Sequence, residues 1–95
     1  MLKDIIAVQA EVPYRLRVRF EDGVEGEIDV AELIDFVGVF APLRNWNEFS
    51  KVRVDSETGT IAWPNGADLD PLVIYARITG TPIAALLATG VEVPR

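Results

Sequence analysis

The sequence contains no cysteine and no histidine among its 95 residues. Without cysteine the chain can form no disulfide, no thiolate zinc site and no thiol nucleophile. Without histidine it lacks the commonest general base and the commonest transition-metal ligand. These two absences exclude many catalytic and metal-binding arrangements before any pattern is considered.

Positive charge is scarce as well, because nine lysines and arginines stand against fifteen aspartates and glutamates, for a net charge of −6. This balance argues against a nucleic-acid-binding protein that relies on a basic surface. The longest uncharged stretch, residues 78–91, is interrupted by two glycines and a proline. A membrane-spanning helix needs about 20 apolar residues. With no recognisable signal peptide either, we expect a cytoplasmic protein without a membrane anchor.

What remains is typical of one small globular domain. Hydrophobic residues make up 49% of the chain, which is enough for a single core. The patterns predict three strands, a short helix, two strands and two further helices. We therefore expect residues 1–95 to form a single α+β domain, in which short helices back a small, mostly antiparallel sheet of two hairpins plus an N-terminal strand.

Strict alternation marks residues 14–20 and 24–30 as two half-buried strands of the first hairpin. The charged residues that alternate with apolar ones are Arg15, Arg17 and Arg19 on one strand and Glu25, Glu27 and Asp29 on the other. A three-residue loop ending at Gly23 places each arginine beside a carboxylate and leaves the apolar side chains together. We interpret the charges as a solvated face that neutralises itself, with a partner-binding charged face as the alternative.

A second hairpin is predicted over residues 51–55 and 60–63, and it ends at Pro64 because proline cannot donate to a strand ladder. Asp29 and Asn45 are in position to cap short helices that follow them. The predicted core of the domain is Leu16, Val18, Phe20, Ile28, Val30, Phe40, Leu43, Phe49, Val52, Val54, Ile61 and Trp63. We expect the helix that follows Asp29, with its continuation, to turn three side chains inward: Leu33, Ile34 and Val37.

Two helix starts are visible in the last third of the chain. Asp70 is a preferred N-cap, and Pro71 suits the first helical position because its missing amide is not needed there. Gly80 then marks the end of this helix. Thr81 and Pro82 repeat the start signal and predict a short helix over residues 83–88.

The strongest candidate for a functional loop is IAWPNGADLDP, at residues 61–71. Its candidate residues are Trp63, Asn65, Gly66, Asp68 and Asp70, and Trp46 from the preceding loop is a further candidate. The two aspartates beside an Asn-Gly turn could bind a hard cation, but the additional acidic ligands of a calcium loop are missing. We therefore favour a turn that ends a strand and starts a helix, and we expect neither metal nor cofactor. Trp63 is expected in the core and Trp46 in a polar loop.

A nucleophilic site is not apparent. Ser50 and Ser56 have no histidine to activate them, and neither stands in a glycine-flanked turn. The carboxylates of the first hairpin are opposed by arginines, unlike a buried acid–base pair. We therefore expect no enzymatic activity.

The C-terminal segment is the most apolar part of the chain. Ile83, Leu86 and Leu87 occupy one side of its short predicted helix, and alanines fill the rest. Surplus apolar surface of this kind usually marks an interface. We expect the segment to contribute to a symmetric homodimer, and the alternative is that it folds back and completes the core.

Three stretches of the chain resemble a small bacterial family catalogued as domain of unknown function 2442. They are YRLRVRFEDG with its acidic partner EGEIDV, then FAPLRNWNEFSKVRVD, and finally GTIAWPNGADLDPLVIY. Residues 63–71 match the family's W-P-N-G-x-D-[LI]-D-P pattern, and we name them the signature segment. The resemblance covers residues 2–79 and leaves residues 80–95 as a C-terminal helical extension.

The resemblance implies a compact α+β fold with strands backed by one or two helices. It implies little biochemistry, because the family has no established activity. Members often resemble one half of a two-gene unit beside another small protein, and some are considered toxin–antitoxin-like. Other members are fused to a C-terminal helix-turn-helix. The fifteen residues after Gly80 are too few for such a domain, so any role with DNA is expected to be indirect.

We therefore expect a non-catalytic protein-interaction or regulatory module, the partner of another small protein in a toxin–antitoxin-like unit. We expect it to bind a protein, and neither a membrane nor nucleic acid directly. The alternative is a small-ligand-binding or enzymatic domain that uses the loop from Trp63 to Asp70 with Trp46. A deep pocket containing Asp68 and Trp46 would favour that alternative.

Overall fold

A computed structural model describes residues 3–86 of the chain. Its first part is a three-stranded antiparallel sheet in the order β1-β2-β3. The strands are β1 (Ile5–Glu11), β2 (Arg15–Phe20) and β3 (Glu25–Asp29). Each strand turns its alternate apolar residues to one face, so this sheet has a buried inner face and a charged outer face.

A second antiparallel sheet has the order β4-β5-β6. Its strands are β4 (Arg53–Asp55), β5 (Thr60–Ala62) and β6 (Asp68–Leu69). Val54 pairs with Ile61, as the hairpin pattern predicts. The short strand β6 pairs with β5 through Leu69 and Asp68, and the hydroxyl of the buried Thr60 donates a hydrogen bond to the carbonyl of Leu69.

Short helices join and cover the sheets. They are α1 (Val30–Leu33), the 3₁₀ helix η1 (Gly38–Arg44), α2 (Trp46–Phe49) and α3 (Pro71–Thr79). Asp29, Asn45 and Asp70 cap α1, α2 and α3 through their side chains, as their positions before the helices predict. Residues 83–86 add a helical turn after α3. No helix within residues 3–86 is long and apolar enough to cross a membrane.

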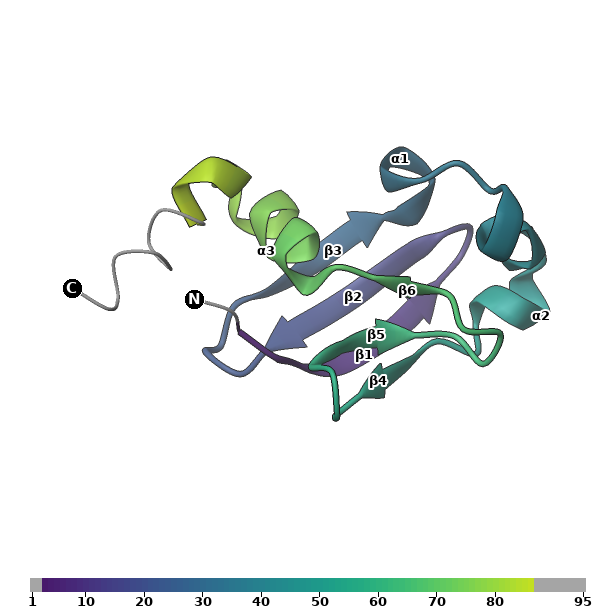
Figure 1. Cartoon of the computed structure of the whole chain (residues 1–95), viewed down its shortest axis with the longest axis horizontal. Helices are drawn as coiled ribbons and strands as arrows, with labels where there is room; N and C mark the ends of the chain where they lie inside the picture. Colours follow the sequence, from purple (N-terminus) through teal and green to yellow (C-terminus); the bar gives the residue numbers. More distant parts are fainter. Residues whose placement is uncertain (1–2, 87–95) are drawn as a thin grey trace.

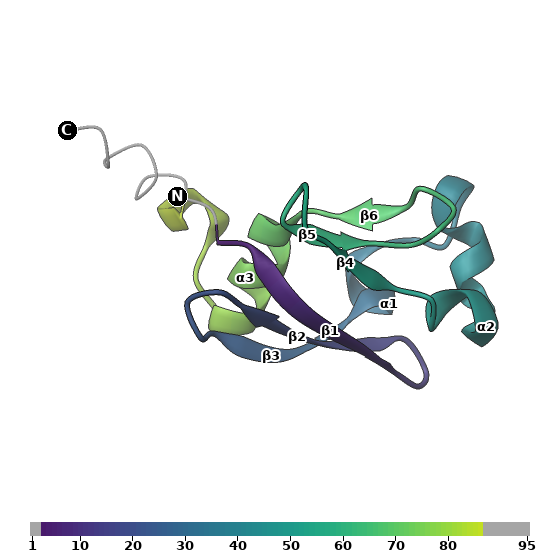
Figure 2. The same ribbon diagram turned by 90° about the horizontal axis from the view of Figure 1, so that it is seen from below.

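The two sheets face each other, and β1 lies beside β4 (Figure 1, Figure 2). On the other side α3 packs against β3, at the position where Gly26 leaves room for Ile78. A Cβ atom at residue 26 would lie 2.8 Å from Cγ2 of Ile78, so a larger residue here would force Ile78 to move. The 3₁₀ helix η1 and α2 lie at one end of the sheets, and α3 lies at the other end (Figure 2).

The α+β class predicted from the sequence is confirmed. The arrangement adds two features that the patterns do not predict. The two hairpins lie in separate sheets, and β6 is a third strand of the second sheet. Two residues are too few to produce a recognisable alternation, so β6 is visible only in the fold.

The register of the first hairpin is the one predicted. Arg17 pairs with Glu27, and the N–H of Phe20 donates to the carbonyl of Val24 at 2.8 Å, which closes a three-residue loop. Gly23 in that loop has φ of 92°, a conformation that residues with a Cβ rarely adopt.

The core lies between the sheets and against α3. Of the twelve predicted core residues, nine are buried, and the other three, Phe40, Val52 and Val54, are half-buried against them. Buried apolar side chains not on the predicted list are Ile5, Ala67, Leu69, Ile74 and Leu86.

The prediction that Val37 faces inward is wrong, because this side chain is 62% exposed. Helix α1 ends at Leu33, Ile34 and Val37 are extended, and a tight turn between them is closed by the N–H of Val37 donating to the carbonyl of Asp35 at 2.8 Å. The helical spacing that would carry Val37 to the inner side is therefore lost, whereas Leu33 and Ile34 remain half-buried.

Candidate functional site

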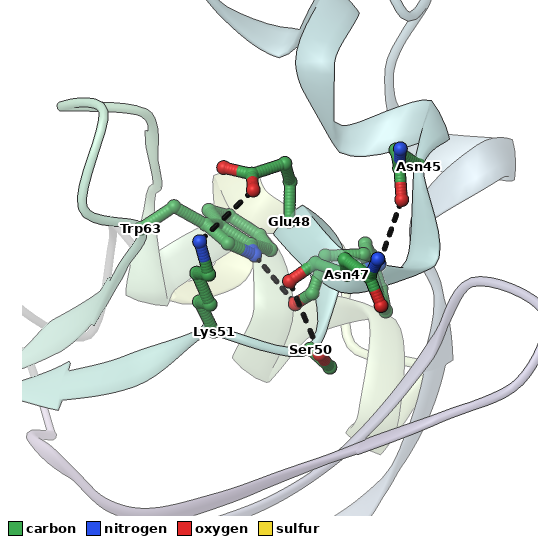
Figure 3. A network of polar contacts seen from close by, with 7 residues as sticks. Asn45, Asn47, Glu48, Ser50, Lys51 and Trp63 are labelled. Carbon is green, nitrogen blue, oxygen red and sulfur yellow. Dashed lines mark hydrogen bonds and ion pairs between the residues drawn. The ribbon is translucent and has the colours of Figure 1, made fainter.

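Trp63, the first residue of the signature segment, is a core side chain as predicted, and it is 1% exposed. Its indole Nε1–H donates a 2.8 Å hydrogen bond to the carbonyl of Phe49 at the end of α2. Its ring also lies 5.8 Å from the ring of Phe49. Both contacts hold α2 against the second sheet, and the hydrogen bond of the indole is drawn in Figure 3.

Asn65 and Gly66 form the turn that leads into β6. The side-chain amide of Asn65 donates to the carbonyl of Val39 at 2.8 Å, and its oxygen accepts from the N–H of Ala67 at 3.1 Å. Gly66 has φ of 94°, which suits glycine at this tight turn. The turn therefore joins the second sheet to η1.

The two aspartates of the signature segment serve different elements. Asp68 lies on β6, paired with Ala62, and it is exposed. Asp70 accepts a 2.8 Å hydrogen bond from the N–H of Leu72 and so caps α3. Within residues 3–86 no three acidic side chains come together in a way that could hold a metal ion. The polar contacts of this segment thus connect α2, η1, β5 and α3.

Trp46 and the polar residues around it lie on the outer side of α2. Asn45 accepts from the N–H of Asn47 at 2.9 Å, and Lys51 forms a 2.9 Å ion pair with Glu48 (Figure 3). The ring of Trp46 lies 5.9 Å from that of Phe49, and the side chain stays 37% exposed. The two tryptophans therefore pack against the same phenylalanine, one buried and one facing solvent.

Exposed apolar side chains gather at the end of the molecule that carries η1 and α2. Six large apolar residues are exposed within residues 3–86, and four of them belong to this end: Val12, Val37, Val39 and Trp46. We name these four residues the end patch. Val12 lies in the β1–β2 turn, which reaches the same end as η1 and α2 in both views (Figure 1, Figure 2).

Tyr14 fixes the β1–β2 turn to the helices of this end. Its hydroxyl donates a 2.7 Å hydrogen bond to the carbonyl of Arg44, the last residue of η1. Its ring centre lies 4.7 Å from that of Phe36 and 5.6 Å from that of Phe49. The turn, the chain before η1 and α2 are thus held together, so the end patch has a fixed support.

Exposure of the end patch is not predictable from the sequence pattern. Val12 precedes a proline and Val39 follows a glycine, so neither belongs to a helical or strand period, whereas the helical spacing of Val37 predicts a buried side chain. Nothing distinguishes these valines from core valines. Trp46 is the one member of the patch that the sequence places among the candidate residues.

The outer face of the first sheet carries rows of opposite charge. Its exposed side chains on β2 and β3 are Arg15, Arg17, Arg19, Glu25, Glu27 and, half-buried, Asp29; we name these six residues the charged face. Arg17 forms a 3.0 Å ion pair with Glu27 and approaches Glu11 of β1 at 4.0 Å. The predicted pairing of the rows is confirmed.

The described surface includes two open grooves. One, of about 300 Å³, borders the charged face and is lined by residues that include Ala7, Gln9 and Arg19. The other, of about 260 Å³, lies between α1, α3 and Ile83. Neither groove contains Trp46 or Asp68, so neither is the deep pocket that would favour a ligand site at the signature segment.

The C-terminal segment is described only as far as Leu86. Ile83 is exposed and Leu86 is buried, whereas Leu87 lies outside the described residues. The homodimer through this segment stays a prediction, as does the alternative that the segment completes the core.

A hydrogen bond ties the tip of the first hairpin to α3. The hydroxyl of Tyr75 donates to the carboxylate of Asp22 at 2.7 Å. This bond, followed by the hydrogen bond from the N–H of Val24, lowers the pKa of Asp22 below its ordinary 3.8. The same bond, together with burial, raises the pKa of Tyr75 above 10.0.

Comparison with known families agrees with the resemblance seen in the sequence. A family model described as "Protein of unknown function (DUF2442)" matches residues 5–80, and the chain belongs to this family. No curated protein and no solved structure matches the chain significantly. The family description assigns no biochemical activity, so a function has to be argued from the surface.

Proposed function

We propose that this protein is a non-catalytic interaction module that docks a partner protein on the end patch. The observation that carries the proposal is the concentration of exposed apolar side chains at one end. Interface centres are rich in aromatic and apolar residues surrounded by a polar rim. Trp46 supplies the aromatic residue, and the exposed Arg44 and Asn47 lie beside it in the sequence.

The rigidity of this end supports the same proposal. Tyr14 and Asn65 anchor its segments through hydrogen bonds of 2.7 and 2.8 Å to backbone carbonyls of η1. A surface that is already fixed loses little conformational freedom when a partner binds, and this favours affinity.

The non-catalytic part of the proposal rests on side-chain chemistry. The chain has no histidine or cysteine. In the signature segment, the side chains of Trp63, Asn65 and Asp70 are bonded to backbone groups of the fold. These contacts favour a structural role for the segment over the ligand-binding or enzymatic alternative.

We further propose that the partner is another small protein and that this chain neutralises or regulates it, as in a toxin–antitoxin-like pair. The resemblance of family members to one half of a two-gene unit motivates this step. The net charge of −6 suits a basic partner and disfavours direct contact with nucleic acid. We place this activity in the cytoplasm.

The test is capture of the protein encoded beside this one by tagged variants. Val39→Asp combined with Trp46→Ser removes apolar surface from the end patch. Ile6→Ser is the matched control, because Ile6 is 53% exposed at the opposite end of β1 from Val12. Thermal unfolding of each variant shows whether the fold is intact.

We expect the native chain and the Ile6→Ser variant to retain the neighbouring protein and the end-patch variant to lose it. Equal retention by all three chains would place the interface elsewhere. Failure of the native chain to retain its neighbour would contradict the two-protein proposal. The emission of Trp46 should also shift on binding, since this indole is partly exposed whereas Trp63 is buried.

A further inference from the structure

The charged face has a pattern that matches itself. Its central strand β2 presents only arginines outward, and the adjacent strand β3 presents only carboxylates, in the pairs Arg15–Asp29, Arg17–Glu27 and Arg19–Glu25. The strands β1, β2 and β3 lie along the lower side of the ribbon in Figure 2, and no other labelled element lies beneath them. We propose that this face binds the same face of a second copy of the chain.

The register of the hairpin decides how two copies would meet. Consider a two-fold axis that lies between the charged faces of the two copies. The axis runs parallel to the strands and passes between β2 and β3. Rotation about this axis places β2 of one copy over β3 of the other without shifting the rows. Arg17 then faces Glu27 of the second copy, and the same holds for the other two rows because each arginine already pairs with a carboxylate in its own row.

Other approaches bring like charges together. An axis perpendicular to the strands would place the arginine strand over the arginine strand of the second copy. A purely anionic partner, such as nucleic acid, that bound along the arginines of β2 would lie only about 4.8 Å from the carboxylates of β3. Those carboxylates would repel it. The pattern therefore selects a partner that carries both signs in alternate rows, and a second copy satisfies this requirement.

The arginines have bonding capacity left for a second copy. Within residues 3–86, Arg17 forms ion pairs shorter than or equal to 4.0 Å, whereas Arg15 and Arg19 form none. On the β1 side, Arg19 stands opposite Ala7 and Arg17 opposite Gln9, and the groove of about 300 Å³ lies along these residues. This space lies next to β3 of the second copy and can accommodate its long glutamate side chains.

The size of the charged face sets the expected strength of association between two copies. The two strands β2 and β3, spaced about 4.8 Å apart and each rising about 3.3 Å per residue over five residues, give a face of roughly 5 by 17 Å between strand axes. This area lies well below that of a stable dimer, so we expect a weak and transient association. Because the contacts are exposed ion pairs, the dissociation constant should rise by about tenfold or more from low to high salt.

Charge exchange between two variants tests the proposal directly. Arg17→Glu alone places two carboxylates opposite each other in the homodimer, and Glu27→Arg alone places two arginines opposite each other. In an equimolar mixture of the two variants, the heterodimer regains opposite charges in every row. Sedimentation velocity over a range of protein concentrations at low salt measures each case.

Each single variant also loses the ion pair within its own chain, and this loss could weaken the fold. A third variant therefore separates an effect on the fold from an effect on the interface. Arg17→Glu combined with Glu27→Arg in one chain reverses the row and retains opposite charges within the chain. This double variant should self-associate as the native chain does. It should not associate with the native chain, because like charges would then face each other across the interface.

The proposal would be supported if the native chain self-associates, each single variant loses this association and the mixture of the two variants recovers it. The double variant should also fail to associate with the native chain. A native chain that is monomeric at low salt and high concentration would overturn it. Unchanged association of the single variants would overturn it as well. Dissociation on truncation after Gly80, with no effect of charge reversal, would instead assign the dimer to the C-terminal segment.

Discussion

The signature segment and the end patch are joined in space but use their side chains in opposite ways. In the signature segment, Trp63 is buried, and Asn65 and Asp70 are bonded to backbone groups of neighbouring elements. In the end patch, Val37 and Trp46 face solvent. The most recognisable pattern in this chain therefore specifies the fold, whereas the surface we propose for binding has no recognisable pattern.

Exchange of the two tryptophans for alanine should separate these roles most strongly. We expect Trp63→Ala to lower the free energy of unfolding by about 3–5 kcal/mol, through a cavity and the loss of the indole hydrogen bond. Trp46→Ala should lower it by less than about 1 kcal/mol, because the side chain is partly exposed, yet should weaken partner capture. Urea unfolding measures both free energies, and similar destabilisation by the two changes would contradict the assignment of Trp63 to the core and of Trp46 to the binding surface.

Asn65 tests the link between the two regions. We expect Asn65→Ala to cost about 1–2 kcal/mol, because the carbonyl of Val39 and the N–H of Ala67 lose their partner. Asn47→Ala is the matched control for the free energy of unfolding, because Asn47 is exposed and its side chain forms no hydrogen bond within the described residues. If partner capture stayed unchanged in Asn65→Ala, the signature segment would not support the end patch.

Asp70 and Asp68 have different roles within the signature segment. Asp70→Ala should cost about 1 kcal/mol through loss of the cap of α3, and Asp70→Ser should recover most of it. Asp68→Ala should change stability by less than about 0.5 kcal/mol, since this side chain is exposed. We also expect no rise of the melting temperature with calcium, magnesium or manganese beyond a salt control; such a rise would restore the metal-site alternative.

The smallest expected effect concerns pH and lies outside both regions. The lowered pKa of Asp22 contributes stability that is present above its unfolded value near 3.8 and is lost as the pH falls through the folded value. The raised pKa of Tyr75 contributes stability that is full below its unfolded value near 10.0 and is lost as the pH rises through the folded value.

Tyr75→Phe tests this hydrogen bond while it keeps the aromatic contact with Phe20 at 4.9 Å. At neutral pH the native chain should have a slightly larger free energy of unfolding than the variant. This difference should disappear at acidic and at alkaline pH. Urea unfolding at acidic, neutral and alkaline pH measures the difference. A constant difference across the three conditions would show that the bond to Asp22 does not contribute through ionisation.

Local features of the fold could be predicted because each rests on a few adjacent residues. The loop through Gly23, the caps at Asn45 and Asp70 and the pairing of Val54 with Ile61 all follow from short patterns. The buried position of Trp63 also followed, since a large aromatic in a small domain is usually core.

Features that depend on packing between distant segments could not be predicted. The strand β6 exists because β5 offers Ile61 and Ala62 as pairing partners, and its two residues carry no pattern of their own. The exposure of Val37 depends on where α1 ends, and that of Val39 depends on how η1 lies against the turn at Asn65. The end patch is therefore a property of the tertiary structure.

The carboxylates of β3 have a second consequence, for solubility. This strand is an edge of its sheet, and an unpaired edge is a template for aggregation with other strands. Two copies of β3 that paired edge to edge in antiparallel fashion would place Glu25, Glu27 and Asp29 against one another. Repulsion between like charges opposes that pairing, so the row of carboxylates protects the open edge from growth into extended sheets.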